Sequence, residues 1–232
     1  MMIIGHRGCA GLEPENTMIA FKRAIELGVT AVELDVRITR DAKVIVIHDP
    51  TLDRTTNMKG SVSSYSYGEL EFADAGKGQK IPLLLDVLNL LKDGKVFVHI
   101  ELKDMHVSER VLEIVKESGM IQQSFLISFW HKELVKAKKL SRIVRTGAII
   151  VHNPVNVKNI FEETMVDFVS VAHDMTDREL VQEVHSLEKQ ITVWGKIDNN
   201  EKIDRLLDIR VDGIASDYPD RLIKRLKELN KG

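Results

Sequence analysis

The chain has 232 residues, of which 44% are hydrophobic and 29% are charged. This is the composition of an ordinary globular protein with room for a substantial core. The formal net charge is −2, which excludes the strongly basic surface of most nucleic-acid-binding proteins, so we expect no such partner. The single cysteine, Cys9, excludes an intramolecular disulfide and favours a reducing compartment.

We find no pattern typical of a targeting segment or a membrane anchor. Residues 1–4 are too few for the hydrophobic region of a signal peptide, and His6 and Arg7 follow at once. The apolar run 81–91 contains Asp86 and is too short to span a bilayer. We therefore predict a cytoplasmic protein without stable membrane anchoring. The sequence leaves the oligomeric state open, a homodimer included.

Short runs rich in Ile and Val alternate with helical patterns along the chain. We predict strands at residues 2–5, 31–36, 44–48, 96–102, 125–129, 147–151, 168–172, 191–194 and 213–216. Helices are predicted from residue 16 or 17 to 28, at 83–91, 108–118, 131–139, 157–164, after a capping box formed by Thr176 and Glu179, at 200–208 and at 220–229. Residues 50–80 have no clear periodicity and read as a surface excursion.

Strands that alternate with helices favour a parallel sheet in an α/β fold. Only the turn 40–43 joins two strands without a helix. Parallel neighbours need a crossover of about a dozen residues, so the strands 31–36 and 44–48 must form an antiparallel hairpin. Eight strands remain, and we predict a closed (β/α)8 TIM barrel with a β-hairpin and a short insertion, residues 49–80, after strand 2. We expect residues 1–232 to form a single domain.

Polar side chains collect at the carboxyl ends of these strands, where barrel enzymes carry their active sites. The first strand leads into His6 and Arg7. Glu33 and Asp35 lie two residues apart on the second strand and therefore share one face. Later strands bring further residues to this edge: Glu101, Lys103, Trp194, Lys196 and Asp217.

The predicted hairpin brings a second histidine to the same edge. A turn centred between Asp41 and Ala42 pairs residues whose numbers sum to about 83, which sets His48 opposite Asp35. A slip of one residue would turn His48 to the other face, so its place depends on the register.

Three carboxylates at one barrel mouth, Glu33, Asp35 and Glu101, would repel one another. One hard divalent cation, Mg²⁺ or Ca²⁺, would relieve this repulsion, because both ions prefer oxygen ligands. Such a metal polarises a phosphoryl oxygen, and Arg7 and Lys103 would hold the remaining phosphate oxygens. The pattern therefore predicts a phosphodiester-cleaving site.

The two histidines complete this predicted site. His6 and His48 would serve as acid and base on opposite sides of the phosphorus, because the departing alkoxide needs a proton. The sequence does not say which histidine is the acid. Trp194 is expected to contact the substrate, to cap the barrel core, or to do both.

Several short motifs occur in a fixed order over almost the whole chain. They are His6-Arg-Gly8, Pro14-Glu-Asn-Thr17, Glu33-Leu-Asp35-Val36, His48-Asp49, Glu101-Leu-Lys103, Ser128-Phe129, Val193-Trp194 and Gly213-Ile-Ala-Ser-Asp217. With this ordered set the sequence resembles the glycerophosphodiester phosphodiesterase family, and with its short insertion it is similar to the cytoplasmic bacterial members.

The resemblance implies a (β/α)8 barrel that hydrolyses glycerophosphodiesters to glycerol 3-phosphate and an alcohol. It implies His6 and His48 as the catalytic pair, with three carboxylates on the metal. Two positions depart from the family pattern. His99 stands where members usually have Asn, and Gly195-Lys196-Ile197 replaces the usual Thr-Val-Asn, which places a cation near the substrate pocket.

Two other functions stay open at this stage. One is a lysophospholipase D-like activity on the same scaffold, which would need an apolar groove at the mouth. Residues of the excursion could line such a groove: Met58, Tyr65, Tyr67, Leu70 and Phe72. The other is a non-catalytic phosphate-ligand binding barrel, which would be expected to lack a histidine or a carboxylate, whereas this chain has them all. The preferred alcohol, and attack by water or by the glycerol 2-hydroxyl, also stay open.

Overall fold

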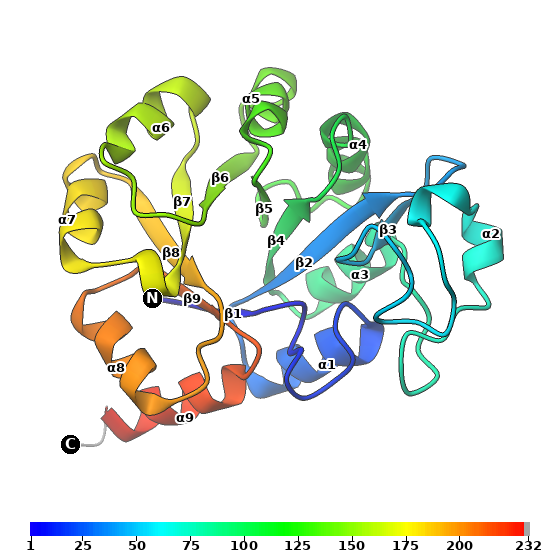
Figure 1. The fold of residues 1–232 in the computed structure, drawn as a ribbon, viewed down its shortest axis with the longest axis horizontal. Helices are drawn as coiled ribbons and strands as arrows, with labels where there is room; N and C mark the ends of the chain where they lie inside the picture. Colours follow the sequence, from blue (N-terminus) through cyan, green and yellow to red (C-terminus); the bar gives the residue numbers. More distant parts are fainter. Residues whose placement is uncertain (230–232) are drawn as a thin grey trace.

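A computed structural model describes residues 1–229 of the chain (Figure 1). The strands are Met2–Gly5 (β1), Ala31–Ile38 (β2), Val44–Val46 (β3), Phe97–Leu102 (β4), Ser124–Ser128 (β5), Arg145–Ile150 (β6), Phe168–Ala172 (β7), Gln190–Trp194 (β8) and Gly213–Ser216 (β9). The α-helices are Met18–Leu27 (α1), Tyr67–Leu70 (α2), Leu84–Asp93 (α3), Ser108–Glu117 (α4), His131–Leu140 (α5), Val157–Thr164 (α6), Arg178–Ser186 (α7), Asn200–Asp208 (α8) and Pro219–Leu229 (α9). There are also two short 3-10 helices, Val62–Ser64 (η1) and His173–Met175 (η2).

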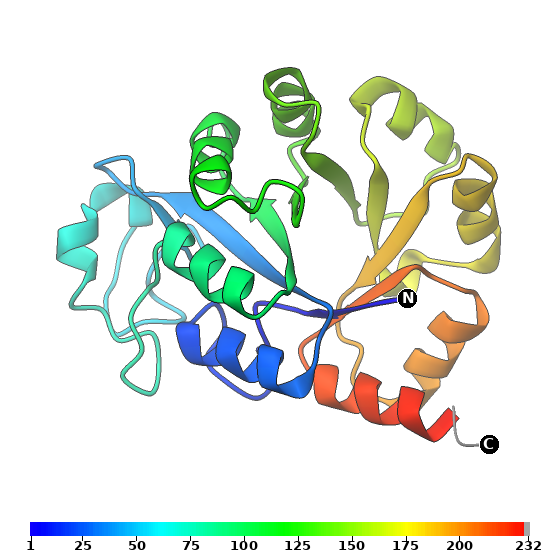
Figure 2. The same cartoon turned by 180° about the vertical axis from the view of Figure 1, so that it is seen from behind.

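Eight of the strands form a closed parallel barrel. β1 pairs in parallel with β9 on one side and with β2 on the other, and the remaining strands follow in chain order from β4 to β9. The helices lie outside the strands in both views (Figures 1 and 2), and α9 packs beside α1 and α8. The predicted (β/α)8 TIM barrel is confirmed.

Apolar residues form two layers, one on each side of the barrel wall. Residues that face outward from the strands, such as Leu34 and Val36 on β2, pack against the helices in the main core. A smaller cluster that includes Phe125 packs inside the barrel. Since neighbouring residues of a strand point to opposite faces, Glu33 and Asp35 point into the barrel.

β2 extends beyond the barrel and pairs antiparallel with β3, so the hairpin is confirmed. Its predicted register is wrong by one residue, because Val36 lies opposite Val46 and the paired numbers sum to 82. The turn is therefore centred on Asp41. Ala42 adopts a left-handed conformation with φ of 59°, as is common in three-residue hairpin loops.

The predicted strand 44–48 is also too long, since β3 ends at Val46. The one-residue error in the predicted register therefore does not turn His48 away from the mouth, because His48 lies beyond the paired residues of β2 and β3. The Ile47 N–H still donates to the Asp35 carbonyl at 2.9 Å. The Arg37 Nε donates to the His48 carbonyl at 2.8 Å and fixes the loop. Loop contacts, and not strand alternation, place His48.

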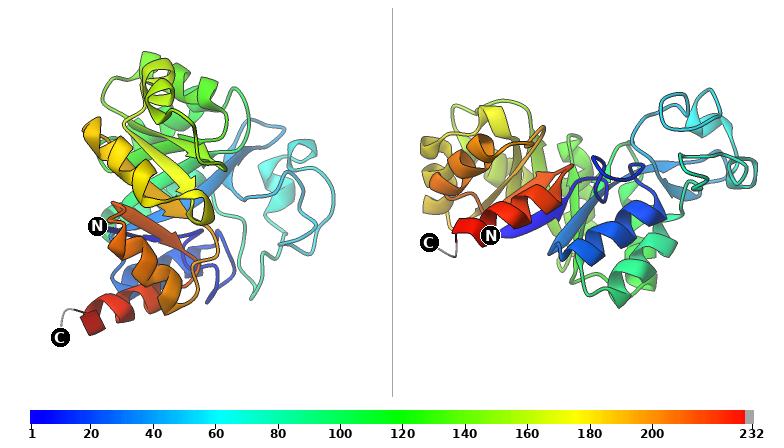
Figure 3. Two further views of the ribbon diagram at one scale, coloured as in Figure 1. Left: turned by 60° about the vertical axis from the view of Figure 1, so that its left-hand side comes forward. Right: turned by 90° about the horizontal axis from the view of Figure 1, so that it is seen from below.

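The insertion, residues 49–80, forms a small layer of its own beside the hairpin. Figure 3 shows this segment (cyan) on the side of the barrel away from α7 and α8. Its apolar residues pack into a separate core with residues of β3 and the segment before α3: Ile45, Ile47, Leu52, Val62, Leu70, Ala73, Ala75 and Ile81. The insertion therefore lies against the barrel next to His48.

The predicted capping box of the seventh helix is wrong. The N-cap of α7 is Asp177, whose side chain accepts from the Leu180 N–H at 2.8 Å. The Thr176 hydroxyl donates to the Ala172 carbonyl at 3.0 Å. Among residues 1–229, no helix has the length and apolar character needed to cross a membrane.

Candidate active site

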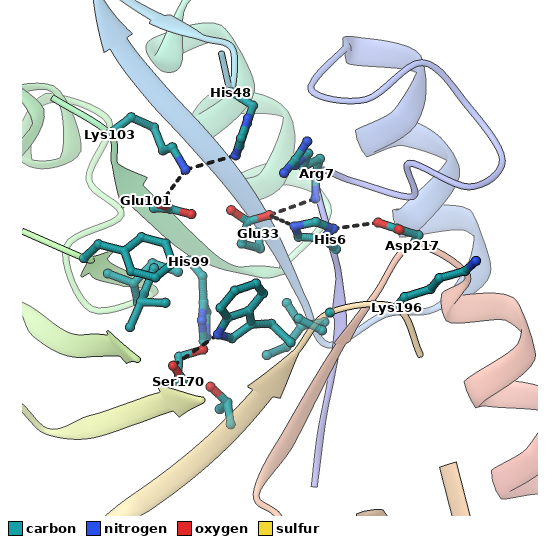
Figure 4. Close-up of a pocket in the computed structure, with 18 residues that line it drawn as sticks. His6, Arg7, Glu33, His48, His99, Glu101, Lys103, Ser170, Lys196 and Asp217 are labelled. Carbon is teal, nitrogen blue, oxygen red and sulfur yellow. Dashed lines mark hydrogen bonds and ion pairs between the residues drawn. The ribbon is translucent and has the colours of Figure 1, made fainter. Parts of the chain in front are cut away.

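The carboxyl ends of the strands surround a cavity of about 240 Å³ (Figure 4). Seven of the eight predicted site residues line it: His6, Arg7, Glu33, His48, Glu101, Lys103 and Trp194. The eighth, Asp35, is fully buried and lies next to Glu101 in the register of β2 and β4. The structure therefore brings together all the residues that the sequence predicts.

His6 follows β1 and lies between two carboxylates. Its Nδ1 is 2.6 Å from the Asp217 Oδ1, and its Nε2 is 3.8 Å from the Glu33 Oε2 (Figure 4). Burial alone would lower the pKa of His6, but the charge of Glu33 and the hydrogen bond to Asp217 outweigh it and raise the pKa. The protonated form of His6 is therefore favoured.

Arg7 adopts a left-handed conformation, with φ of 48°, which turns its side chain across the mouth. Its backbone N–H donates to the Glu33 Oε2 at 2.9 Å, and its Nη1 donates to the Glu15 Oε1 at 2.7 Å. The next residue must be glycine, because a Cβ on Gly8 would come within 2.8 Å of the Ala20 backbone. The turn after β1 therefore requires glycine at position 8.

Glu33, Asp35 and Glu101 form a buried carboxylate cluster. Each offers an oxygen atom, and these atoms lie within 4.8 Å of one another. The Glu33 Oε1 and the Asp35 Oδ1 are buried and have no hydrogen-bond partner in the described part of the chain. The set fits a hard divalent cation, because such ions take carboxylate oxygens as ligands.

The pKa values of these carboxyls reflect their crowding. Burial and the charge of Asp35 raise the pKa of Glu33 to about 8 and that of Glu101 to about 7. Burial would also raise the pKa of Asp35, but the charges of Arg7 and Lys103 outweigh it and lower the pKa. A cation among them would therefore be stabilising.

Lys103 and His48 face each other across the mouth. The Lys103 Nζ lies 2.7 Å from the Glu101 Oε1 and 3.0 Å from the His48 Nε2. The His48 Nδ1 is 2.6 Å from the Asp49 Oδ1. Burial, with the charges of Arg7 and Lys103, outweighs the nearby carboxylates and lowers the pKa of His48. The neutral form of His48 is favoured, in contrast to His6.

Aromatic residues form another part of the cavity wall. The Phe129 and Trp194 rings meet edge to face at 5.8 Å, and the Trp194 Nε1 donates to the Ser170 carbonyl at 3.2 Å. Trp194 also packs against the cluster inside the barrel, so it caps that core while it lines the cavity.

The two departures from the family pattern lie in different surroundings. His99 is buried inside the barrel, where its ring lies 4.7 Å from that of Phe125, and burial lowers its pKa to about 3. It is a neutral residue of the interior layer. The Lys196 side chain is 81% exposed, and in Figure 4 it extends away from Glu33.

Several residues that support the site have no role predicted from the sequence. The Asn16 Nδ2 donates to the Asp35 Oδ2 at 2.8 Å, and Asp217, Asp49 and Glu15 each contact a predicted site residue. All four lie within the sequence motifs that carry the family resemblance, and this is the signal that could have identified them. Their contacts depend on loop conformations, such as the φ of 58° at Asn16, that residue patterns do not reveal.

The barrel, the carboxylate cluster, the two histidines and the basic pair define a phosphodiester-cleaving hydrolase. The model of the glycerophosphoryl diester phosphodiesterase family matches residues 6–221. The chain therefore belongs to this family.

Individual relatives agree with the family assignment. A glycerophosphodiester phosphodiesterase of Bacillus altitudinis is 34% identical over 244 residues, and one of Caldanaerobacter subterraneus subsp. tengcongensis is 31% identical over 239 residues. Both alignments cover 98% of this chain and 98% of the relative. Among solved structures, a phosphodiesterase of Oleispira antarctica in complex with the product sn-glycerol-3-phosphate has a TM-score of 0.89 at 24% identity. The match covers 97% of this chain and 96% of that chain, and it supports the fold.

Proposed function

We propose that the protein is a metal-dependent enzyme that hydrolyses glycerophosphodiesters to glycerol 3-phosphate and an alcohol, with two histidines as acid and base. The observation that carries this proposal is the meeting of three kinds of group at one cavity. They are the carboxylate cluster, the pair Arg7 and Lys103, and the histidines His6 and His48, each backed by a carboxylate.

The proposed metal ligands are Glu33, Asp35 and Glu101. Their crowding supports a cation at this point, since two of their oxygens are buried without a hydrogen-bond partner among residues 1–229 and two of their pKa values are raised. When bound, Mg²⁺ or Ca²⁺ would polarise a phosphoryl oxygen and offset the negative charge that develops there.

Arg7 and Lys103 are the proposed phosphate ligands. Both side chains are mostly buried and line the cavity from opposite sides of the carboxylate cluster. Arg7 offers a planar fork for two phosphate oxygens, whereas Lys103 offers a compact charge. Trp194 supplies an apolar wall against one arm of the substrate.

The opposite directions of the two histidine pKa values support an acid role for His6 and a base role for His48. His48 donates its Nδ1–H to Asp49, which leaves Nε2 to accept the proton of the attacking hydroxyl. His6, whose raised pKa favours the protonated form, gives a proton to the departing alkoxide as the bond from phosphorus to that oxygen breaks. The scheme holds whether water or the glycerol 2-hydroxyl attacks.

The test is hydrolysis of glycerophosphocholine and glycerophosphoethanolamine, followed by release of glycerol 3-phosphate. We expect activity to be lost in EDTA and restored by Mg²⁺ or Ca²⁺. His48→Ala is expected to lose about 10²- to 10⁴-fold in kcat, the usual contribution of a general acid or base. Full activity in His48→Ala would contradict the mechanism.

The lysophospholipase alternative predicts that apolar residues of the excursion line the cavity, and in residues 1–229 the five named residues do not. Met58, Tyr65, Tyr67 and Leu70 pack into the core of the insertion. Phe72 is 79% exposed, and none of these residues lines the cavity. We therefore expect the turnover of acylated substrates to be lower than that of deacylated ones.

A further inference from the structure

Arg54 lies in the insertion, outside the barrel, yet its guanidinium bridges two carboxylates at the mouth. Its Nε and Nη2 lie 2.7 Å and 2.9 Å from the two oxygens of Asp49. Its Nη1 and Nη2 each lie 2.8 Å from an oxygen of Glu15. Both contacts are bidentate, so all three guanidinium nitrogens are used.

Each of these carboxylates also contacts a residue of the proposed reaction. The Asp49 Oδ1 is 2.6 Å from the His48 Nδ1, and the Glu15 Oε1 is 2.7 Å from the Arg7 Nη1. Arg54 therefore stands at the centre of a continuous chain of charged groups. One end of this chain is the proposed base, and the other end is the proposed phosphate fork.

The charges along this chain alternate in sign. The hydrogen bonds from Arg54 lower the pKa of Asp49, and those from Arg54 and Arg7 outweigh burial and lower the pKa of Glu15, so both carboxyls stay ionised. An ionised Asp49 can only accept, which fixes the proton of His48 on Nδ1. Arg54 holds both oxygens of each carboxylate, whereas His48 contacts only the Oδ1 of Asp49 and Arg7 only the Oε1 of Glu15.

We propose that Arg54 is a positioning residue that orients His48 through Asp49 and Arg7 through Glu15. The inference rests on the proposed function, which gives those two residues their roles. It assigns a catalytic purpose to the insertion, because the insertion carries the group that couples two segments of the barrel mouth.

The hairpin turn offers a matched control. Arg40 has a comparably exposed side chain, and it also ties the insertion in place, with its Nη2 2.7 Å from the Glu69 Oε2 and its Nη1 2.6 Å from the Ser64 carbonyl. It contacts neither His48 nor Arg7. Arg40→Gln therefore removes a similar anchor of the insertion and leaves the chain of charged groups intact.

The experiment compares wild type, Arg54→Ala, Arg54→Lys and Arg40→Gln for kcat, KM and melting temperature on glycerophosphocholine at saturating metal. We expect Arg54→Ala to lose about 10- to 100-fold in kcat/KM, with lower kcat and higher KM. This is the usual loss when a residue that orients an active-site ligand through a hydrogen bond is removed. Arg54→Lys should retain only part of the activity. Lysine keeps the positive charge, but an ammonium cannot bridge two carboxylates as a guanidinium fork does. Added guanidinium ion should restore activity to Arg54→Ala only.

A second readout does not depend on the substrate. The ¹⁵N spectrum of the His48 ring should show a single Nδ1–H tautomer in wild type and in Arg40→Gln, and a mixture in Arg54→Ala. Wild-type kcat/KM in Arg54→Ala, or a loss that Arg40→Gln matches and guanidinium does not restore, would overturn the inference. If Arg54→Ala does not fold, wild-type kcat/KM in Arg54→Lys would overturn the inference. An inactive wild type would refute the proposed function, and the tautomer would still test Arg54.

Discussion

The two histidines of the mouth share one arrangement and differ in their surroundings. Each lies 2.6 Å from an aspartate through Nδ1, but Glu33 faces the Nε2 of His6, whereas Lys103 faces that of His48. The opposite charges of these neighbours contribute to moving the pKa of His6 up and that of His48 down. Burial lowers the pKa of both histidines; Glu33 and Asp217 outweigh it at His6, whereas at His48 Arg7 and Lys103 act in the same direction as burial.

This difference predicts the pH dependence of kcat/KM. A base works only when unprotonated, so the rate should rise with pH through the lowered pKa of His48, below the ordinary value of 6.5. An acid works only when protonated, so the rate should fall as pH passes the pKa of His6, which the hydrogen bond to Asp217 also raises when a metal is bound to Glu33. We expect a bell-shaped profile at saturating metal, measured from about pH 5 to 9 on glycerophosphocholine. The residual activity of His48→Gln should lack the acidic limb of the profile. An acidic limb that persists in His48→Gln would belong to another group.

At the scale of elements, strand patterns were sufficient to predict the barrel. Apolar runs and helical periodicity located all eight barrel strands, because the main core depends on those residues. The hairpin was predicted from the length of its turn alone. Its register was not, since the left-handed Ala42 that centres the turn on Asp41 has no signature in residue type.

The same limit applies to the site. Carboxylates on strands, such as Glu33 and Asp35, follow from alternation, and the structure brings them together as predicted. Contacts made by loop residues could not be predicted, because they depend on backbone angles such as the positive φ of Arg7 and Asn16. Arg54 is the extreme case, since it joins Asp49 at the start of the insertion to Glu15 in the loop before α1.

The start of α7 gives a test at the element scale. Asp177→Ala removes the side chain that accepts from the Leu180 N–H, so we expect the free energy of unfolding to fall by about 1 kcal/mol, the usual value of an N-cap. Glu179→Ala is the control, because the capping box would give Glu179 a similar role and the structure does not. We expect that variant to change stability by less than about 0.5 kcal/mol. Urea unfolding followed by circular dichroism measures both, and equal losses would favour the capping box.

At the scale of the whole molecule, the carboxylate cluster makes stability depend on metal. A ligand that binds only the folded protein stabilises it by about 2.7 kcal/mol at a concentration of 100 times Kd. For a protein of this size, that is a rise in Tm of about 5 to 10 °C. We expect Mg²⁺ or Ca²⁺ to raise the Tm relative to EDTA, and Asp35→Asn to reduce the rise. An equal rise in Asp35→Asn would place the metal elsewhere.

Without metal, the same cluster should make stability fall as pH rises. Glu33 and Glu101 have folded pKa values of about 8 and about 7, against 4.5 for an unperturbed glutamate. The folded protein therefore holds protons that the unfolded chain has already lost, so the contribution of these two carboxyls to stability is full below about pH 4.5 and declines as pH rises toward 8. In EDTA we expect the Tm to fall between about pH 5 and 8, whereas saturating metal should weaken this dependence because it favours the ionised carboxylates. Glu33→Gln should flatten the EDTA curve. An EDTA curve as steep in Glu33→Gln as in wild type would show that the cluster does not carry the dependence.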